Sequence, residues 1–512
     1  MNELENESLL DAMPPDETRR IRYEVLDMDQ VRVDPGLTLK VPAALALRKQ
    51  VLPLCKINDE ILVACSDIED VTTQRQLEKL FDQELRLLSA EPDSLRRALK
   101  RVYGSSTAGA KPMRSRSGDA SVIDLDDAVT ICDDLMQAAA LRGASDIHLI
   151  PNEKSLVVKL RVDGKLEPLS TIPTDMQGAV ISRIKVQSGL DIAEKRSPQD
   201  GRFTARIGAE QKKVDIRVAT LPTRFGERVT MRLLGGQAGA ISLTNLGMND
   251  VNLTAFRRAI ARPHGLVLLT GPTGSGKSTT LYAAIEEVLR SRGGNVITVE
   301  DPIEYEMEDV SQVEIDSADK VSFDMALRSI LRHDPDVVMI GEIRDLETAE
   351  IAVKASLTGH LVFSTLHTNS AIGVVTRLAD MGLQRFLIAA TLRLAIAQRL
   401  VRRLCVKCRE ARELTQREAD LLGRPEIAGQ TVYDPGQCVY CAGRGFTGRV
   451  ALIELFDCDV EAAELIATGA SEEAMIAHAH QRQDAMLMDD AIDKMFAGVT
   501  SYQEVLEAVV VW

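Results

Sequence analysis

The sequence is poor in aromatic side chains and carries no excess of positive charge. Aromatic residues make up 4% of its 512 residues, and the single tryptophan is Trp512. A stacking platform for bases or sugars is therefore not expected. The formal net charge is -15 at pH 7, whereas proteins that bind nucleic acid need lysine and arginine to displace counterions from the phosphates. We therefore expect no nucleic-acid partner.

Long apolar runs are also missing. A membrane-spanning helix needs about 20 consecutive apolar residues, and no stretch of this chain approaches that length. The segment LIAATLRLAIAQRLV, residues 387–401, is interrupted by arginines and is predicted to be a buried amphipathic helix. The N-terminal MNELENESLLDAMPPDE is acidic and lacks the basic and apolar regions of a signal peptide. We expect a cytoplasmic protein, in which any membrane role comes through a partner.

Cysteine is scarce, and half of the eight residues are grouped. The scattered cysteines are predicted to be buried thiols; they are Cys55, Cys65, Cys132 and Cys458. The others form two C-x-x-C pairs, a spacing that turns four thiolates toward one tetrahedral Zn²⁺ and leaves no open position for chemistry. The predicted zinc ligands are Cys405, Cys408, Cys438 and Cys441, in an insert at about 400–448.

Composition and periodicity divide the chain into three predicted domains. Residues 1–103 contain a small α+β domain with alternating helix-like and strand-like segments. A Gly/Ser-rich linker, 104–121, leads to a second domain at 122–234, which opens with a helix and continues with β-type alternation. A hinge at 235–242 precedes the third domain, 243–512, where strands alternate with helices as in a parallel α/β sheet.

The third domain contains GPTGSGKSTT directly after the apolar GLVLLT and before LYAAIEEVL. This is the G-x-x-x-x-G-K-S pattern in its expected context, with a strand before the loop and a helix after it. Backbone N–H groups of such a loop surround phosphates at the positive end of the helix. Lys277 would reach the β- and γ-phosphates, and Ser278 would ligate Mg²⁺. The predicted nucleotide-binding residues are Gly271, Pro272, Thr273, Gly274, Ser275, Gly276, Lys277, Ser278 and Thr279.

Two acidic residues stand at the ends of apolar strands in the same domain. DVVMIGE ends in Glu342, with Gly341 where a Walker B strand usually has aspartate, and NVITVEDPIE contains Glu300. Parallel strands bring their carboxyl ends to one crevice, so both acids are expected beside the phosphates. One would hold Mg²⁺ and the other would activate the attacking water. Spacing alone does not assign these two tasks.

Four segments together resemble a known family. GPTGSGKST, TVEDPIE, LRHDPDVVMIGEIRD and TGHLVFSTLHTNSA are similar, in order and spacing, to the Walker A, Asp box, Walker B and His box of the secretion ATPases, which power type II secretion and type IV pilus assembly. The resemblance covers about Val122 to Trp512 and, more loosely, the N-terminal domain. It implies an α/β fold with a P-loop RecA-like core, a preceding α+β (PAS-like) domain, a small N-terminal α+β docking domain and the zinc subdomain.

The resemblance also implies roles for individual residues. Glu300 would be the general base, Glu342 the acid of the Mg²⁺ site, and His367 would sense the γ-phosphate or position the water. Arg217 and Arg232 of the second domain would reach across to the nucleotide, where arginine stabilises transition-state charge. Secondary candidates, each of which could instead form an ordinary salt bridge or a structural contact, are Arg328 and Arg332 (four apart on one helix face), Arg344 (which could pair with Asp345 or Glu347) and His360.

Members of the family form hexamers that use ATP with Mg²⁺, and the extension and secretion types carry the zinc insert. The resemblance implies that the hexamer acts on an inner-membrane platform protein and that the N-terminal domain docks on a membrane protein with a cytoplasmic domain. Residues 1–103 contain no R-L-G-x-x-L-type repeat, so cyclic di-GMP is not expected. The short N-terminal region and the total length favour type II secretion. Three alternatives stay open: a type IV pilus assembly ATPase, a DNA-translocating ATPase and a nucleotide-gated zinc scaffold without turnover.

Overall fold

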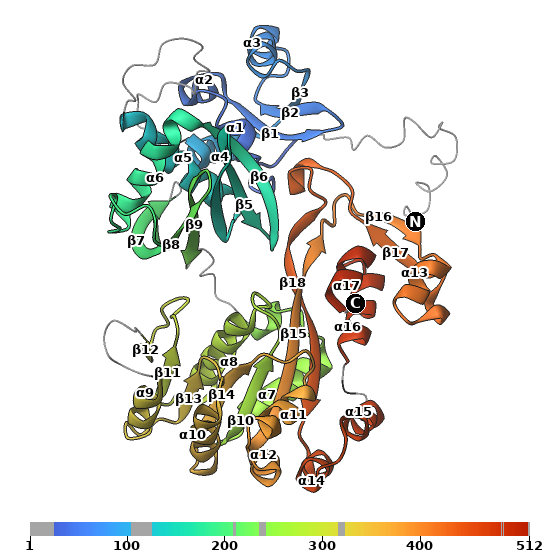
Figure 1. Cartoon of the computed structure of the whole chain (residues 1–512). Helices are drawn as coiled ribbons and strands as arrows, with labels where there is room; N and C mark the ends of the chain where they lie inside the picture. Colours follow the sequence, from blue (N-terminus) through green and yellow to red (C-terminus); the bar gives the residue numbers. More distant parts are fainter. Residues whose placement is uncertain are drawn as a thin grey trace. The chain divides into compact units, whose positions relative to one another are not determined.

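A computed structural model describes residues 25–103, 125–207, 211–234, 242–315, 323–482, 484 and 486–509. These residues divide into two compact units (Figure 1). The smaller lies within Met1–Val162, Leu166–Arg232 and Gly436–Gly445, and the larger within Asp163–Lys165, Leu233–Pro435 and Phe446–Trp512. The predicted linker and nearly all of the predicted hinge lie outside the described residues, so the domain boundaries stay predictions.

The first part of the smaller unit is a three-stranded sheet in which β1 is antiparallel to β2 and β2 is parallel to β3. Its elements are α1 (Pro35–Thr38), α2 (Ala43–Lys49), β1 (Val51–Ile57), β2 (Glu60–Cys65), α3 (Val71–Phe81), β3 (Leu85–Ser89) and α4 (Pro92–Tyr103). The expected helices and strands of this region are confirmed. Strand β3 was not expected, because its sequence LRLLS is too short to show a clear period.

The second part is a six-stranded sheet of order β6-β5-β4-β9-β8-β7 with two helices. Its elements are α5 (Leu125–Arg142), β4 (Asp146–Pro151), β5 (Ser155–Val162), β6 (Lys165–Pro173), α6 (Thr174–Gln187), β7 (Gln199–Ile207), β8 (Lys212–Thr223) and β9 (Gly226–Leu234). Strand β5 alternates between buried and half-buried residues, which is the pattern of a sheet with one covered face. The expected β-rich character of this region is confirmed.

The larger unit contains a seven-stranded sheet of order β12-β11-β13-β14-β10-β15-β18. All neighbours in it are parallel except β15 and β18, which are antiparallel. Its strands are β10 (Gly265–Thr270), β11 (Val296–Glu300), β12 (Val310–Glu314), β13 (Val337–Ile340), β14 (Leu361–Leu366), β15 (Leu392–Leu404) and β18 (Phe446–Asp457). The predicted parallel α/β sheet is confirmed.

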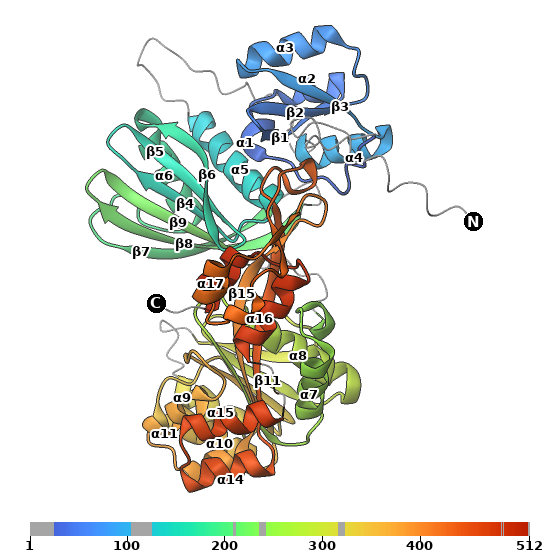
Figure 2. The same ribbon diagram turned by 90° about the vertical axis from the view of Figure 1, so that its right-hand side faces the viewer.

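Helices cover both faces of this sheet. They are α7 (Asp250–Ile260), α8 (Lys277–Arg292), α9 (Phe323–Ile330), α10 (Leu346–Leu357), α11 (Gly373–Asp380), α12 (Arg385–Thr391), α14 (Val460–Thr468), α15 (Glu472–Gln481), α16 (Leu487–Phe496) and α17 (Tyr502–Val509). Along β10, Leu266 and Leu268 belong to one apolar core, whereas Val267 and Leu269 belong to the other. Figure 2 shows α7 and α8 on one side of the sheet and α10 and α11 on the other. Among the described helices, none is both long and apolar enough to cross a bilayer.

A small subdomain follows β15 in the chain. It consists of the antiparallel strands β16 (Glu410–Glu413) and β17 (Thr431–Asp434), with α13 (Gln416–Leu421), η2 (Pro425–Ile427) and η3 (Val439–Cys441). Helix α13 begins with a capping box, in which the Thr415 hydroxyl and the Glu418 carboxylate satisfy each other's backbone N–H groups. This subdomain brings the two cysteine pairs into one region of the chain.

The predicted helix at 387–401 is wrong over most of its length. Helix α12 ends at Thr391, and the remaining residues form β15. Strand β15 lies between β10 and β18 in the sheet, so nearly all its residues from Leu392 to Gln398 are buried, whichever face they are on. A strand buried on both faces shows no two-residue alternation, and its apolar run is indistinguishable from that of a buried helix.

The core of the sheet supplies a test of the fold. Phe363 in β14 has 0% of its surface exposed and packs in the core shared with α7 and α8. We expect Phe363→Ala to lower the free energy of unfolding by about 3–5 kcal/mol, because it removes buried surface and leaves a cavity. The measurement is denaturant unfolding of the full chain. The control is Phe386→Ala, since Phe386 is 58% exposed; equal losses in both variants would contradict the assigned core.

Candidate functional site

The glycine loop between β10 and α8 is held tightly against β15. Gly271, Gly274 and Gly276 have φ values of 141°, 80° and 89°, a region that glycine enters without strain. A Cβ atom at Gly271 would lie 2.3 Å from the carbonyl oxygen of Gln398, and one at Gly276 would lie 2.7 Å from the Gln398 Nε2. Gly271 and Gly276 are therefore required by packing as well as by backbone conformation.

Helix α8 begins directly after this loop without a side-chain cap. The residue before the helix is Gly276, which supplies no side-chain cap, and the first turn of this described helix contains no acidic residue. Lys277 Nζ lies over the loop and donates to the carbonyl oxygens of Gly271 at 2.7 Å and Pro272 at 3.1 Å. Burial lowers the pKa of Lys277, and the carboxylate of Glu342 opposes that shift. The helix N-terminus and the amine form a cationic cradle suited to phosphates.

Two adjacent residues of β15, neither of them predicted from the sequence, have contacts near the site: Gln398 with the glycine loop and Arg399 with the segment after β14. Gln398 of β15 is 1% exposed; its Nε2 donates to the Ser275 carbonyl at 2.8 Å, and its Oε1 accepts from the Thr280 hydroxyl at 2.8 Å. Arg399 donates to the Asn369 carbonyl at 3.2 Å, and burial lowers its pKa. The sequence does contain one sign of Gln398, a glutamine inside an apolar run. Because that run was predicted to be a helix, Gln398 was not expected beside the glycine loop.

Glu342 and His367 meet at the ends of adjacent strands. Glu342 follows β13, His367 follows β14, and the His367 Nε2 lies 3.0 Å from one carboxylate oxygen of Glu342. Arg344 Nε donates to the other oxygen at 3.0 Å. The Thr368 N–H donates to the hydroxyl of Thr270 at 2.7 Å, which ties the His-box loop to the end of the P-loop strand. Two predicted residues, Glu342 and His367, are thus brought together, and Glu342 is close enough to Lys277 to act on its pKa.

Gly341, where the sequence departs from the usual Walker B aspartate, lies close to the neighbouring strand. Its N–H donates to the Val299 carbonyl at 2.8 Å. A Cβ atom there would lie 3.2 Å from that same oxygen and 3.5 Å from the Glu300 Cα. The narrow gap between β13 and β11 therefore favours glycine at this position.

Glu300 lies at the tip of β11 beside β13 but has a different environment from Glu342. It is 3% exposed, and its carboxylate accepts hydrogen bonds from the hydroxyl of Tyr282, from Thr298 Oγ1 at 2.6 Å and from Gln312 Nε2 at 3.1 Å. Glu342, by comparison, retains 23% exposure of its side chain. One acid is enclosed by donors, and the other is partly open and contacts Arg344 and His367.

His360 lies at the opposite end of β14 from His367. It precedes the first residue of the strand, whereas His367 follows the last. The Nδ1 of His360 lies 2.9 Å from the Ala355 carbonyl oxygen and 3.2 Å from the Thr358 hydroxyl. The structure therefore places His360 at the end of α10, away from the P-loop end of the strand.

The secondary arginines have local partners. Arg328 forms an ion pair with Glu347, on α10. Arg332 donates to the Arg328 carbonyl at 3.0 Å; it lies beyond α9, which ends at Ile330, so the expectation that both arginines share one helix is wrong. Arg344 pairs with Glu342 rather than with either predicted partner, and Asp345 instead caps α10.

The two arginines expected to reach the nucleotide belong to the smaller unit. Arg217 is half-buried on β8, opposite Arg202 on β7. Arg232 is 60% exposed on β9, and its Nε donates to the Asp146 carboxylate at 2.9 Å. Their approach to a nucleotide stays a prediction. Ser278 is exposed in the first turn of α8, as a magnesium ligand would have to be.

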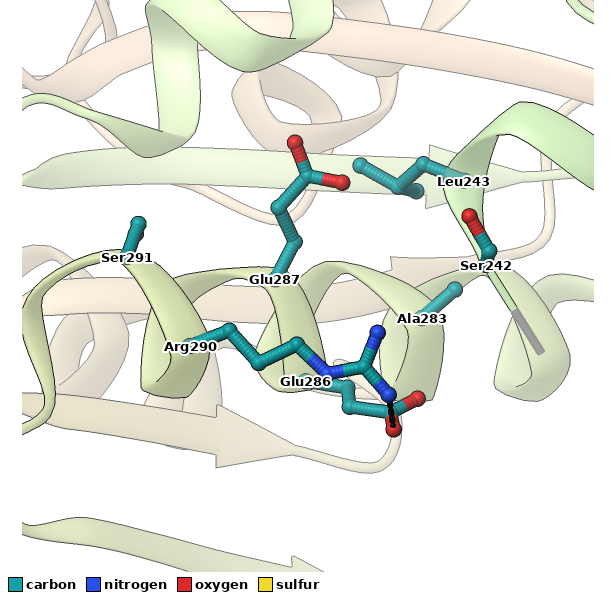
Figure 3. A pocket seen from close by; sticks show the side chains of 7 residues that line it. All are labelled: Ser242, Leu243, Ala283, Glu286, Glu287, Arg290 and Ser291. Atoms are coloured by element: carbon teal, nitrogen blue, oxygen red, sulfur yellow. Dashed lines mark hydrogen bonds and ion pairs between the residues drawn. The ribbon is translucent and has the colours of Figure 1, made fainter. Parts of the chain in front are cut away.

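A separate cavity of about 230 Å³ lies along the later turns of α8 (Figure 3). It is lined by Ser242, Leu243, Ala283, Glu286, Glu287, Arg290 and Ser291. Arg290 forms an ion pair with Glu286 across one side of it. None of the predicted nucleotide-binding residues lines this cavity, so it is distinct from the P-loop site.

The four paired cysteines converge. Their sulfur atoms all lie within 4.8 Å of one another and all four residues are buried. The Cys438 and Cys441 sulfurs are 3.7 Å apart, close to the ~3.8 Å edge of a tetrahedron with Zn–S bonds of about 2.3 Å. The Gly445 N–H donates to the Cys441 sulfur at 3.1 Å. The donor set therefore fits Zn²⁺ at Cys405, Cys408, Cys438 and Cys441.

The scattered cysteines are buried thiols, as expected. Burial raises the pKa of Cys55, Cys132 and Cys458 to about 12 and that of Cys65 to about 11. A thiol with so high a pKa is a poor nucleophile and a poor metal ligand at neutral pH. These four residues are parts of the apolar cores.

Comparison with protein families identifies the chain. A family described as "Type II/IV secretion system protein" matches residues 123–507. This chain belongs to that family. A second match, to the "MshEN domain", covers residues 21–109. The secretion-family match includes the P-loop, Glu300, Glu342 and the cysteine cluster, which confirms the resemblance drawn from the sequence.

Individual relatives cover most of the chain. It is 41% identical to the type II secretion system protein E of Pseudomonas aeruginosa, over 91% of this chain and 95% of that protein. It is 38% identical to the type IV pilus assembly ATPase PilB of Myxococcus xanthus, over 94% of this chain and 88% of that protein. Among solved structures, the pilus retraction motor PilT with bound ADP has a TM-score of 0.50 and 28% identity, covering 72% of this chain and 94% of that chain.

The packing of the glycine loop predicts that two of its glycines, Gly271 and Gly274, differ in their tolerance of a side chain. Gly271→Ala places a Cβ against the Gln398 backbone, whereas Gly274→Ala meets no atom within 4 Å. We expect Gly274→Ala to lower the free energy of unfolding by about 1–2 kcal/mol, because alanine is strained in a left-handed backbone conformation. Gly271→Ala should lower it by at least about 3 kcal/mol, because its Cβ also collides with β15. Denaturant unfolding without nucleotide measures both. Equal costs would show that β15 does not hold the loop.

The cysteine cluster predicts a structural metal. Cys438→Ser should lower the zinc content from about one per chain and lower the thermal unfolding temperature, because metal binding supplies folding free energy for such a subdomain. Elemental analysis and calorimetry measure the two effects. Cys458→Ser is the matched control, since Cys458 is buried outside the cluster and should leave the zinc content unchanged. Equal zinc contents in both variants would contradict the assignment.

Proposed function

We propose that this chain is the ATPase of a type II secretion system and that it hydrolyses ATP to drive assembly of a pseudopilus. The observation that carries the proposal is the contact between Glu342 and His367 at the P-loop end of the sheet, with Glu342 close enough to act on the pKa of Lys277. The similarity of this chain, over nearly its full length, to a type II secretion system protein E supports the secretion role. The similar coverage of a pilus assembly ATPase makes pilus extension the second candidate.

The proposed mechanism assigns each group a task. The N–H groups of the loop and Lys277 would hold the β- and γ-phosphates, and Ser278 and Glu342 would hold Mg²⁺. When bound, MgATP supplies the phosphoryl group that is transferred to water. Glu300 would accept the proton of that water, and His367, placed by Glu342, would orient the water or contact the γ-phosphate.

The proposal extends to assembly and partners. Arg217 and Arg232 would stabilise transition-state charge from the second domain, as arginines supplied by a neighbouring domain or subunit do in other phosphoryl-transfer enzymes. The chain would work as a homo-hexamer at the cytoplasmic side of the inner membrane. It would act on a membrane platform protein, and its N-terminal domain would dock on the cytoplasmic part of a second membrane protein. Zn²⁺ would have a structural role only.

Substituting each acid separately tests the mechanism. We expect Glu300→Gln to lower kcat at least 100-fold with ATP affinity within about threefold of wild type, because proton acceptance contributes about 10²–10⁴-fold. We expect Glu342→Gln to lower kcat as well and to raise the Mg²⁺ concentration needed for half-maximal activity. Phosphate release and binding of a fluorescent ATP analogue, both across a magnesium titration, measure these effects.

The control is Glu347→Gln, which removes an exposed acid on α10 that pairs with Arg328. It should leave kcat and the magnesium requirement within about twofold of wild type. Mild and equal effects at Glu300 and Glu342 would show that the site is assigned incorrectly. ATP binding without hydrolysis by the purified wild-type hexamer, even with acidic phospholipid and the docking partner present, would favour a nucleotide-gated scaffold instead.

A further inference from the structure

The carboxylate of Glu300 is held by donors from three elements. Thr298 of β11 and Gln312 of β12 both donate to one oxygen, at 2.6 Å and 3.1 Å. The other oxygen accepts from the hydroxyl of Tyr282, on α8. Because two donors share the first oxygen, the Tyr282 contact is the one that fixes the direction of the second.

Tyr282 is itself held in place on both its ring and its hydroxyl. It is 1% exposed, and its ring packs edge-on against Tyr305 with centroids 4.2 Å apart at 61°. Its hydroxyl oxygen accepts from the Glu304 N–H at 3.2 Å while its proton goes to Glu300. Burial raises the pKa of Tyr282, so the phenol stays protonated and remains a donor. The hydroxyl thus joins the tip of β11 to the loop that follows it.

The position of Tyr282 on α8 connects Glu300 to the phosphate-binding loop. Helix α8 begins at Lys277, so Tyr282 lies less than two turns from the predicted phosphate and magnesium ligands on the same helix. The first turn of the helix is in turn fixed by the bond between Thr280 and Gln398. A rigid helix therefore carries both the phosphate cradle and the group that orients the second acid.

We propose that Tyr282 is a positioning residue that sets the placement of the Glu300 carboxylate relative to the phosphate-binding loop during ATP hydrolysis. The inference rests on the proposed function, in which Glu300 accepts the proton of the attacking water. Catalysis by such a group depends on geometry, and displacements of about 1 Å can cost about 100-fold in rate. The hydroxyl acts through Glu300 and makes no bond with substrate in this scheme.

The test is Tyr282→Phe, which keeps the ring and removes only the hydroxyl. We expect kcat to fall at least tenfold, while KM and the affinity for a fluorescent ATP analogue stay within about twofold of wild type. The matched control is Tyr305→Phe, which removes a hydroxyl from the ring packed on Tyr282 and leaves the donor to Glu300 in place. This control should keep kcat within about twofold of wild type.

A double-mutant cycle separates positioning from a general effect on folding. In a Glu300→Gln background, Tyr282→Phe should cause no further loss in single-turnover rate, because no carboxylate remains to be placed. The proposal would be overturned if Tyr282→Phe lowered the rate by the same factor in wild type and in Glu300→Gln and also lowered the thermal unfolding temperature. A wild-type kcat for Tyr282→Phe would overturn it as well. Wild-type turnover in Glu300→Gln alone would overturn the proposed role of Glu300, a result distinguishable from failure at Tyr282.

Discussion

The contact between the glycine loop and β15 is the constraint on which the nucleotide site depends. In a P-loop, successive backbone N–H groups must point toward the same phosphates. A glycine-rich backbone is flexible and does not hold that arrangement by itself. Here Gln398 supplies the restraint: it is buried, donates to the Ser275 carbonyl and accepts from the Thr280 hydroxyl. A side chain at Gly271 would collide with the backbone oxygen of Gln398, and one at Gly276 would collide with its side-chain amide. The loop is shaped by the strand beside it before any phosphate arrives.

The two acids at the strand tips illustrate how similar positions acquire different chemistry. Glu342 is partly exposed and contacts the guanidinium of Arg344 and the imidazole of His367. Glu300 is enclosed, and all three of its donors are neutral. An enclosed carboxylate with fixed neutral donors suits a group that must hold one orientation, whereas an open one beside cations suits the binding of a metal ion.

Much of the fold and the site could be predicted from the sequence, and the failures have physical causes. Short motifs of adjacent residues mark the P-loop, the ends of β11 and β13 and the cysteine pairs. These features could therefore be located from the sequence alone. Strand β15 was predicted as a helix because burial on both faces removes the alternation that distinguishes a strand. Gln398 and Tyr282 were not found because their importance comes from contacts across 118 and 18 residues of chain, which no local pattern records.

Strand β15 also has a mechanical consequence. Gln398 lies in its middle, and Cys405 follows its last residue, Leu404. Seven residues of extended chain span about 23 Å, and β15 is paired with β18 along most of that stretch. Apart from the irregular pairing between Arg402 and Leu404, this stretch is extended and has little slack, so a shift of the glycine loop along this direction would be transmitted to Cys405, the first of the four clustered cysteines. The four-cysteine cluster, whose donor set fits Zn²⁺, thus begins at the far end of the strand that contacts the glycine loop.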